Sequence, residues 1–147
     1  MHYEGTFDVK APKEKVYSIV MDPNQISKCM PDLQKLDIKS ADEFNVVLRA
    51  GVSFIKGDFS LRFTTVEKTP PTHAKLAGHG TGIGSTVDLD VLMDFSDGPN
   101  GGTSMKWSAD AKIGGRIASV GQRLLNSQAE KIIKQLFDCL KTTLEAA

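Results

Sequence analysis

Hydrophobic and polar residues alternate along most of the first three quarters of the chain, a pattern typical of strands with one buried face. The alternation is cleanest from Val87 to Phe95, where Asp88, Asp90 and Asp94 occupy the opposite parity. It predicts strands at 3–10, 36–38, 44–50, 59–65, 74–80, 87–95 and 105–111, with an earlier start at Phe54 and Ile55 open for the strand at 59–65. A short helix is expected after Ala11-Pro12, and a helical turn over 23–28, capped by Asp22 and ended by Cys29-Met30-Pro31.

The period changes near residue 115. Apolar residues then recur at spacings of three and four, which predicts one long helix over 115–145, about 45 Å in length. This helix is the only element large enough to cover the apolar face of the sheet. The fold class is therefore α+β: a curved antiparallel sheet wrapped around a long C-terminal helix, with two short helices after the first strand. Residues 1–147 are expected to form a single domain, and the space between sheet and helix is a candidate site for an apolar ligand.

Composition narrows the function classes. Lys and Arg number 18, Asp and Glu also number 18, and the formal net charge is zero, which argues against a general nucleic-acid binder. No apolar run is long enough to span a membrane, and the N-terminus shows no secretory signal. Cys29 and Cys139 fit no disulfide or metal framework. We therefore expect a cytoplasmic protein with two reduced thiols.

The glycines between Gly78 and Gly84 superficially resemble a phosphate-binding loop. Such a loop needs a helix after it, and here strands are expected on both sides. The alternative is that the glycines lie within a strand, where the lack of a side chain permits a bulge, a bend or the close approach of another group. On this interpretation Gly78 and Gly80 leave room on the inner face for a ligand.

No arrangement of residues indicates catalysis or metal binding. The aspartates opposite the Val87–Phe95 face do not have the spacing of a calcium loop, and His79 is predicted to point outward. Cys29 has no predicted base, so it is expected to pack rather than react. The inward positions contain no acid or base. The sequence therefore predicts no catalytic residue, no metal and no cofactor.

The start of the predicted long helix is rich in small residues. Gly121 would cost about 1 kcal/mol relative to Ala inside a helix, so a spatial reason for it is expected. Two interpretations remain open: close packing of helix on sheet, or a cleft between them. Arg123 is expected either to form a rim salt bridge or to meet the polar head of a ligand.

Several short motifs together resemble one family. They are Asp22-Pro23 with Cys29-Met30-Pro31, the stretch from Leu76 to Gly82, and Gly114-Gly115-Arg116-Ile117-Ala118 followed by Gly121-Gln122-Arg123-Leu124. They are similar to the G-subunit family of carbon monoxide dehydrogenase, in the START-like (SRPBCC) helix-grip superfamily. The resemblance covers essentially the whole chain.

The resemblance implies a helix-grip fold over an apolar cavity. It also implies an accessory role beside a molybdenum-containing carbon monoxide dehydrogenase, with membrane recruitment of that enzyme and binding of a quinone. Two departures stand out: Asp32 replaces a glycine common in the family, and the chain stops at Ala147 without the C-terminal membrane-binding segment of some members. Direct membrane anchoring is therefore not expected, while peripheral contact stays open.

We predict a non-enzymatic protein that holds a hydrophobic small molecule, a quinone or lipid, between sheet and helix. The predicted lining is Met30 and Pro31 as a lid, Leu48, Phe59, Leu61, Phe63, Leu76, Gly78, Leu89 and Trp107 on the sheet, and Ile117, Val120, Gly121 and Leu124 on the helix. Arg123 is the candidate polar rim. Two alternatives remain: a START-like enzyme such as a cyclase or hydrolase, and an assembly or membrane-recruitment adaptor that works through its outer surface without a ligand.

Overall fold

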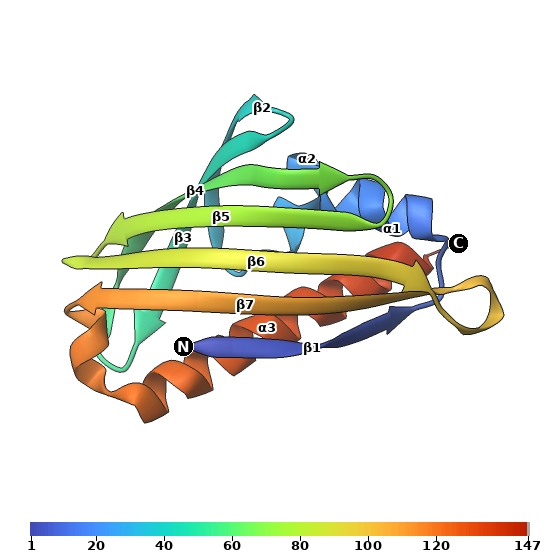
Figure 1. Cartoon of the computed structure of the whole chain (residues 1–147). Coiled ribbons are helices and arrows are strands. Elements are labelled where there is room, and N and C mark those ends of the chain that lie inside the picture. The colour runs from blue at the N-terminus through green and yellow to red at the C-terminus, as the bar shows by residue number, and fades with distance from the viewer. Residues whose placement is uncertain (147) are drawn as a thin grey trace.

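A single curved antiparallel sheet of seven strands dominates the computed structural model, which describes residues 1–146 (Figure 1). The strand order is β1-β7-β6-β5-β4-β3-β2, so every neighbouring pair except β1 and β7 is also consecutive in sequence. The strands are β1 (His2–Val9), β2 (Leu33–Ser40), β3 (Glu43–Val52), β4 (Ile55–Thr69), β5 (His73–Gly82), β6 (Ser85–Asp97) and β7 (Thr103–Gly115). The predicted antiparallel sheet is confirmed, and only Ala147 lies outside the described residues.

The helices follow the first strand and the last. They are α1 (Lys13–Val20), α2 (Pro23–Ile26) and α3 (Gln122–Glu145), with 3-10 turns η1 (Ser27–Cys29), η2 (Pro99–Gly101) and η3 (Ile117–Val120). Asp22 caps α2 as predicted, because its Oδ1 accepts a hydrogen bond from the backbone N–H of Asn24 at 2.9 Å. The long helix α3 crosses the concave face of the sheet (Figure 1). Within residues 1–146, no helix is both long and apolar enough to cross a membrane.

Strand parity matches the sequence prediction closely. In β6, Met93 and Phe95 are buried, and Asp88, Asp90 and Asp94 on the other face are exposed. The one local error concerns Phe54, which lies in the turn before β4 rather than in the strand and is 83% exposed.

The long helix begins later than predicted. The strand β7 continues to Gly115, η3 follows, and α3 starts only at Gln122. Gly121 is therefore not inside a helix: it adopts φ 99° and ψ 154° at the junction between η3 and α3. An L side chain rarely adopts this conformation, and that supplies the reason for a glycine here.

The two cysteines form a disulfide, so the expectation of two reduced thiols is wrong. The Cα atoms of Cys29 and Cys139 are 5.4 Å apart, although 110 residues separate them in sequence. Close approach depends on η1 folding back against the second half of α3. Sequence spacing carries no signal of such a contact.

The backbone at Asp32 adopts a conformation that favours glycine. It lies in the turn between η1 and β2 and has φ 49°, in the left-handed region. Its carbonyl oxygen accepts a hydrogen bond from the N–H of Arg49 at 3.0 Å, which fixes the turn against β3. Aspartate tolerates this conformation better than most residues, so the departure from the family pattern leaves the fold intact.

Candidate functional site

The predicted sheet residues share one face, the concave face that α3 covers. Leu48 lies opposite Phe59, Phe63 opposite Gly78, and Gly78 opposite Leu89 in the strand register. One lateral row therefore crosses five strands on the inner face: Phe44, Phe63, Gly78, Leu89 and Ala111. The eight sheet positions predicted from parity therefore share this inner face, spread over β3 to β7.

Packing on this inner face is divided between two buried clusters. The larger lies where α1 and the end of α3 meet the sheet, and it includes Phe7, Val16, Phe95, Met105 and Leu140. The smaller lies where α3 begins, and its buried members are Ile55, Phe59, Ile117 and Leu125. Each end of the sheet–helix sandwich therefore contains a buried apolar cluster.

Between the two clusters the inner face is less well covered. Apolar side chains here lie on the face that α3 covers and are only half-buried, although Phe44 and Val46 of β3 on the same face are buried. The half-buried ones are Leu61, Phe63, Leu76, Leu89, Val91, Trp107, Ala109 and Ala111 on the sheet, and Ile133, Leu136 and Phe137 on α3. Leu61 packs against the smaller cluster, and Leu76, Val91, Trp107, Leu136 and Phe137 pack against the larger one. A band of half-buried apolar side chains between two buried clusters is an arrangement that suits a hydrophobic ligand.

The helix-side prediction is only partly supported by these positions. Ile117 is 8% exposed within the smaller cluster, and Val120 packs against that cluster. Gly121 is exposed, with no atom within 4 Å of where a Cβ would lie, and Leu124 is 45% exposed. These residues lie at one end of the interior rather than along its middle.

The middle of α3 supplies the residues that the predicted lining omits. The Phe137 ring lies 5.2 Å from the Trp107 ring and 4.9 Å from the Phe7 ring, measured between centroids. Ile133 and Leu136 are half-buried on the same part of the helix. Their three-and-four spacing is visible in the sequence. Because the helix was predicted to start near residue 115, the predicted helix-side lining falls on residues 117–124 instead.

Gly78 and Gly80 do not leave an empty space. A Cβ on Gly80 would clash with Cδ2 of Leu61 and lie 2.5 Å from Cε1 of Phe59. A Cβ on Gly78 would lie 3.0 Å from Cε1 of Phe63. The large side chains of β4 lie across the glycines of β5, so the expectation that these glycines make room for a ligand is wrong. The glycines let the β4 side chains lie flat on the sheet.

The predicted lid lies next to the disulfide. Met30 and Pro31 are half-buried and directly follow η1, whose Cys29 is bonded to Cys139 of α3. Their segment is thereby attached to the helix as well as to the sheet.

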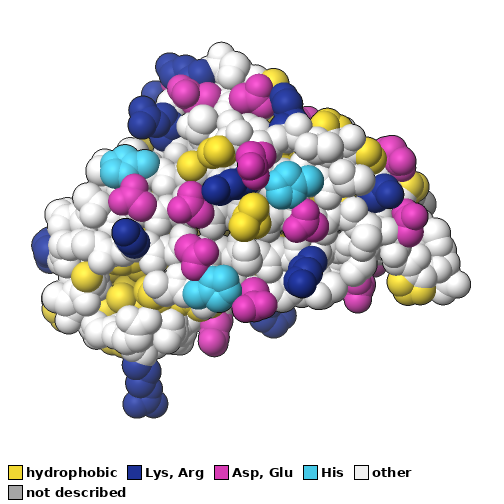
Figure 2. All heavy atoms as spheres, viewed as in Figure 1, with side chains coloured by type: hydrophobic (Ala, Val, Ile, Leu, Met, Phe, Trp, Pro, Cys, Tyr) yellow, Lys and Arg dark blue, Asp and Glu magenta, His cyan; other side chains and the backbone are white. Residues whose placement is uncertain are grey.

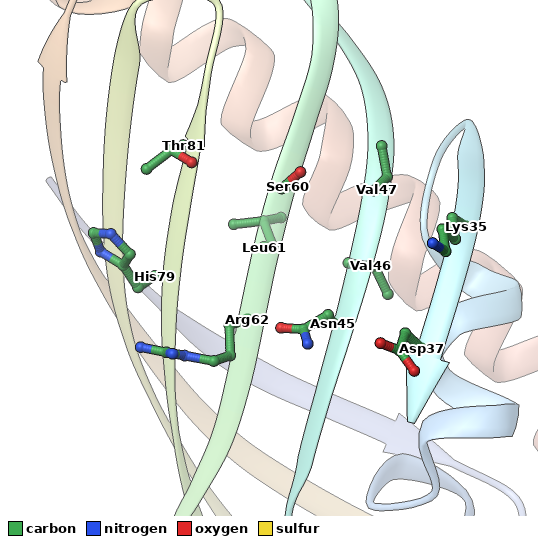
Figure 3. Close-up of a pocket in the computed structure, with 10 residues that line it drawn as sticks. All are labelled: Lys35, Asp37, Asn45, Val46, Val47, Ser60, Leu61, Arg62, His79 and Thr81. Carbon is green, nitrogen blue, oxygen red and sulfur yellow. The ribbon is translucent and has the colours of Figure 1, made fainter. Parts of the chain in front are cut away.

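The outer face of the sheet carries a shallow polar hollow of about 380 Å³ (Figure 3). Asn45, Arg62 and His79 lie side by side in register across β3, β4 and β5, and Figure 3 shows Arg62 extending toward His79. His79 Nδ1 lies 2.6 Å from Oδ1 of Asp88 on the next strand. Lys35, Asp37, Ser60 and Thr81 complete the polar lining. The hollow is open and of mixed charge, and it is separate from the inner face.

The three histidines all lie on the outer face, each opposite an aspartate in the register. His2 faces Asp110, His73 faces Asp94, and His79 faces Asp88. Hydrogen bonds to Asp110 and Glu4 raise the pKa of His2, and hydrogen bonds to Asp94 and Glu67 raise the pKa of His73. Carboxylates that accept from imidazolium favour its charged form.

Polar groups in the interior have structural partners. Within residues 1–146 the buried polar side chains are Ser27, Ser85 and Thr103. Thr103 Oγ1 donates to the carbonyl oxygen of Ala11 at 2.7 Å, and Ser85 Oγ accepts from the N–H of Ile117 at 2.9 Å. Over the same residues there is no buried carboxylate or imidazole and no cluster of side chains suited to a metal ion. The glycine-rich stretch joins β5 to β6, strand to strand, as predicted.

Arg123 is exposed, and the ion pairs formed within residues 1–146 do not include it. The rim salt bridge expected for Arg123 is therefore not formed. Its guanidinium stands at the end of the molecule where α3 begins.

Comparison with known proteins gives a family and a fold. The family model described as CoxG, the G subunit of carbon monoxide dehydrogenase, matches residues 5–145. A conserved protein from Geobacillus kaustophilus has a solved structure that superposes with a TM-score of 0.90 at 26% identity, covering 98% of this chain and 95% of that one. No curated protein matches the sequence.

More distant structures agree on the fold alone. A START superfamily protein from Mycobacterium smegmatis has a TM-score of 0.73 at 12% identity, with 98% and 97% of the two chains covered. The structure titled Ara h 8.0201 has a TM-score of 0.68 at 10% identity, with 98% and 97% covered. The predicted helix-grip, START-like fold is confirmed.

Proposed function

The chain belongs to the CoxG family, named for the G subunit of carbon monoxide dehydrogenase, and from that premise we propose that it is a binding protein for a hydrophobic small molecule. The ligand would lie between the middle of the sheet and α3, against Leu61, Leu89 and Trp107. Its chemical class would be a quinone or a similar lipid. The protein would serve as an accessory to an enzyme of the molybdenum-containing carbon monoxide dehydrogenase type.

One observation carries the binding proposal: a set of inner apolar side chains, Phe63 and Leu89 among them, is only half-buried between the two buried clusters. A protein that used this interior only as a core would be expected to bury these side chains as completely as those at either end. Removal of apolar surface from water contributes about 25 cal/mol per Å², for the ligand and for the side chains it covers. The driving force would be desolvation, with a few polar groups fixing the orientation of the ligand.

The role of a catalyst is less well supported. The titratable groups with a raised imidazole pKa, His2 and His73, lie on the outer face of the sheet, away from the interior. A START-like enzyme would need an acid or base against the bound substrate. The interior instead offers aliphatic and aromatic side chains.

The first experiment is extraction of the protein, purified from its native host, with organic solvent, followed by mass spectrometry. A stoichiometric quinone or lipid in the extract is expected. An empty extract, together with no binding in the titration below, would refute the proposal and favour an adaptor that works through its outer surface.

A second experiment uses the only tryptophan of the chain. Trp107 lies on the inner face, so a quinone bound there should quench its fluorescence at short range. Titration with menadione or decylubiquinone should give saturable quenching. N-acetyltryptophanamide, titrated in parallel, measures collisional quenching and absorption by the quinone. Quenching that follows the free amide at every concentration would contradict a site beside Trp107.

A further inference from the structure

A polar contact joins Tyr3 on the edge strand β1 to the long helix. The Tyr3 hydroxyl donates a hydrogen bond to Oδ1 of Asn126 at 2.7 Å. Tyr3 lies opposite Ala109 of β7, on the inner face, and Asn126 lies in the first turns of α3. Both residues are half-buried. Asn126 precedes Ile133 and Leu140 at heptad spacing, so a carboxamide occupies a position in a helix stripe that is otherwise apolar.

The Asn126 amide has hydrogen-bonding capacity that the chain leaves unused. Its Oδ1 accepts from Tyr3, while its Nδ2, which can donate twice, has no acceptor among residues 1–146. Side-chain nitrogen and oxygen atoms of that range that lack a partner are not buried, so Nδ2 is accessible. Burial and the Glu130 carboxylate raise the pKa of Tyr3, which keeps its hydroxyl protonated. A donor held on Oδ1 directs Nδ2 away from Tyr3.

Trp107 carries a second unused donor on the same face. It lies opposite Gly5 of β1 in the strand register, and a Cβ on Gly5 would lie 3.2 Å from Nε1 of the indole. The edge of the ring that carries the N–H therefore covers Gly5, the inward position next to Tyr3. This N–H has no acceptor in the described part of the chain and, like Nδ2 of Asn126, it is accessible. Both unused donors thus lie beside one short stretch of β1.

Gly5 separates two contacts between β1 and α3. Before it, Tyr3 reaches the start of the helix; after it, the Phe7 ring stacks on the Phe137 ring at 4.9 Å between centroids. At the inward position between these contacts β1 has no side chain of its own, and the indole of Trp107 lies there instead. A group bound between the two contacts would therefore touch the indole N–H and the accessible amide together.

Polar side chains are numerous on the outer face of the sheet and sparse on the inner one. Figure 2 shows the outer face, where histidine and acidic side chains are mixed with basic ones. On the inner face, the hydroxyls of Ser85 and Thr103 are hydrogen-bonded within the chain. The two unused donors are therefore surrounded by apolar neighbours. A few convergent polar groups in an apolar site are what fixes the orientation of a ligand.

We propose that Asn126 and Trp107 determine which ligand the interior accepts: Nδ2 of Asn126 and Nε1 of Trp107 donate hydrogen bonds to carbonyl oxygen atoms at the head of an apolar molecule. Tyr3 is a positioning residue, because it acts on the ligand through the amide that it orients. Both groups are neutral donors, so the site selects an acceptor and favours a neutral carbonyl over a carboxylate, whose burial costs more. This assignment rests on the proposed function and deepens it, since it names the chemistry that separates one apolar ligand from another.

The test is equilibrium dialysis of the full chain with two ligands, menadione and 2-methylnaphthalene. The second has the same bicyclic skeleton and methyl group and lacks both carbonyl oxygens. Asn126→Leu should lower the affinity for menadione about five-fold, the size of one hydrogen bond between neutral groups, and leave the affinity for 2-methylnaphthalene unchanged.

Two further variants test the other members of the site. Trp107→Phe keeps an aromatic ring and removes the N–H, so it should also weaken menadione binding about five-fold without changing that of 2-methylnaphthalene. Tyr3→Phe should weaken menadione binding by a smaller factor, because the Asn126 amide loses its fixed orientation. It too should leave 2-methylnaphthalene binding unchanged.

Matched controls come from the same helix and the same residue type. Gln135→Leu removes an exposed amide of α3, and Tyr17→Phe removes a hydroxyl that donates to the carbonyl oxygen of His73 at 3.3 Å. Neither should change the affinity for either ligand, and thermal unfolding shows whether each variant is folded. Equal losses for the two ligands in Asn126→Leu would assign Asn126 a packing role and overturn the proposal. Unchanged menadione affinity in both Asn126→Leu and Trp107→Phe would overturn it as well.

The wild-type chain separates this inference from the proposed function. If it binds neither ligand and the solvent extract is empty, the proposed function fails and the assignment of the donors fails with it. If it binds menadione and the variants bind menadione equally well, the ligand function stands and only the assignment of the donors fails.

Discussion

The sulfur of Cys29 is bonded to the sulfur of Cys139, and this bond joins the turn after α2 to the second half of α3. It closes a loop of 110 residues that contains most of the sheet. A cross-link of this kind restricts the unfolded chain, and removal of a native disulfide typically lowers stability by about 2–4 kcal/mol.

We therefore expect a reductant to lower the midpoint of thermal unfolding. The double variant Cys29→Ser with Cys139→Ser should unfold at the lower temperature with or without reductant. Thiol titration of the unreduced, denatured protein gives the independent check. Two reactive thiols per chain, and a midpoint that reductant does not move, would show that the bond does not form in solution.

Ala109→Leu tests whether the interior is open. Ala109 is half-buried on the inner face of β7, opposite Val91 on β6 and Tyr3 on β1. In a filled core the larger side chain should cost about 1–3 kcal/mol. In an accessible interior it should leave the free energy of unfolding nearly unchanged and weaken quenching of Trp107 by menadione.

The control for this variant is Ser108→Leu, on the opposite face of the same strand. It should change neither stability nor quenching by much. A large loss of stability in Ala109→Leu, measured by denaturant unfolding, would indicate a closed core and favour the adaptor alternative.

Gly121→Ala should destabilise the protein by about 1–3 kcal/mol, because φ 99° and ψ 154° suit glycine alone. Space is not the cause, since nothing lies within 4 Å of the added Cβ. The neighbouring variant Gln122→Ala, at the first position of α3, should be close to neutral. A fully stable Gly121→Ala would mean that the junction adopts another conformation. Loss of ligand in Gly121→Leu would not by itself locate the site, because strain would accompany it.

Asp32 gives a prediction in the opposite direction. Because its φ is 49°, Asp32→Gly should be tolerated, with a change of less than about 1 kcal/mol in the free energy of unfolding. Asp32→Val should cost more, about 1–2 kcal/mol, since a β-branched residue is disfavoured in this region. Equal stability of the two variants in urea unfolding would contradict the assigned conformation.

Stability should depend on pH through the histidines on the outer face. The pKa of His73 is raised above its ordinary value of 6.5 by hydrogen bonds to Asp94 and Glu67. A group whose pKa is raised on folding stabilises the folded state below its unfolded pKa, and this contribution disappears as pH rises through the folded pKa. The protein should therefore lose part of its stability as pH rises from about 6 to about 8, the window in which imidazole titrates.

His73→Gln should flatten that dependence, and denaturant unfolding at the two pH values measures it. His2→Gln, which removes the pairing with Asp110 and Glu4, should flatten it in the same direction. A dependence that is unchanged in the variant lacking both histidines would assign the effect to other groups.

The sheet was predictable from sequence because one face of each strand is buried, so parity alone places Leu48, Leu61 and Leu89 on a common surface. The helix start was not, because a 3-10 turn and a helix share the same apolar spacing over a few residues, and only the φ of Gly121 separates them. The disulfide depends on a tertiary contact that sequence spacing does not encode.

The inner-face positions were predictable on the sheet and less so on the helix. Parity alone puts Trp107 on the inner face, whereas its neighbour Phe137 stands out only as part of the helix stripe. The role of Gly78 and Gly80 required the side-chain positions of Phe59, Leu61 and Phe63, since an inward glycine is compatible both with an empty space and with a neighbour that covers it.

The inner face combines two buried clusters with half-buried side chains between them, and this has a consequence for how the protein can diverge. Substitutions at Phe63 or Leu89, which belong to neither cluster, would alter the proposed ligand site, while the clusters around Phe95 and around Phe59 keep the scaffold folded. Ligand selectivity and stability would then depend on different residues and could change independently. A scaffold built in this way can acquire a new cargo without first acquiring compensating stability, and superposition at 10–13% identity is what such freedom would leave behind.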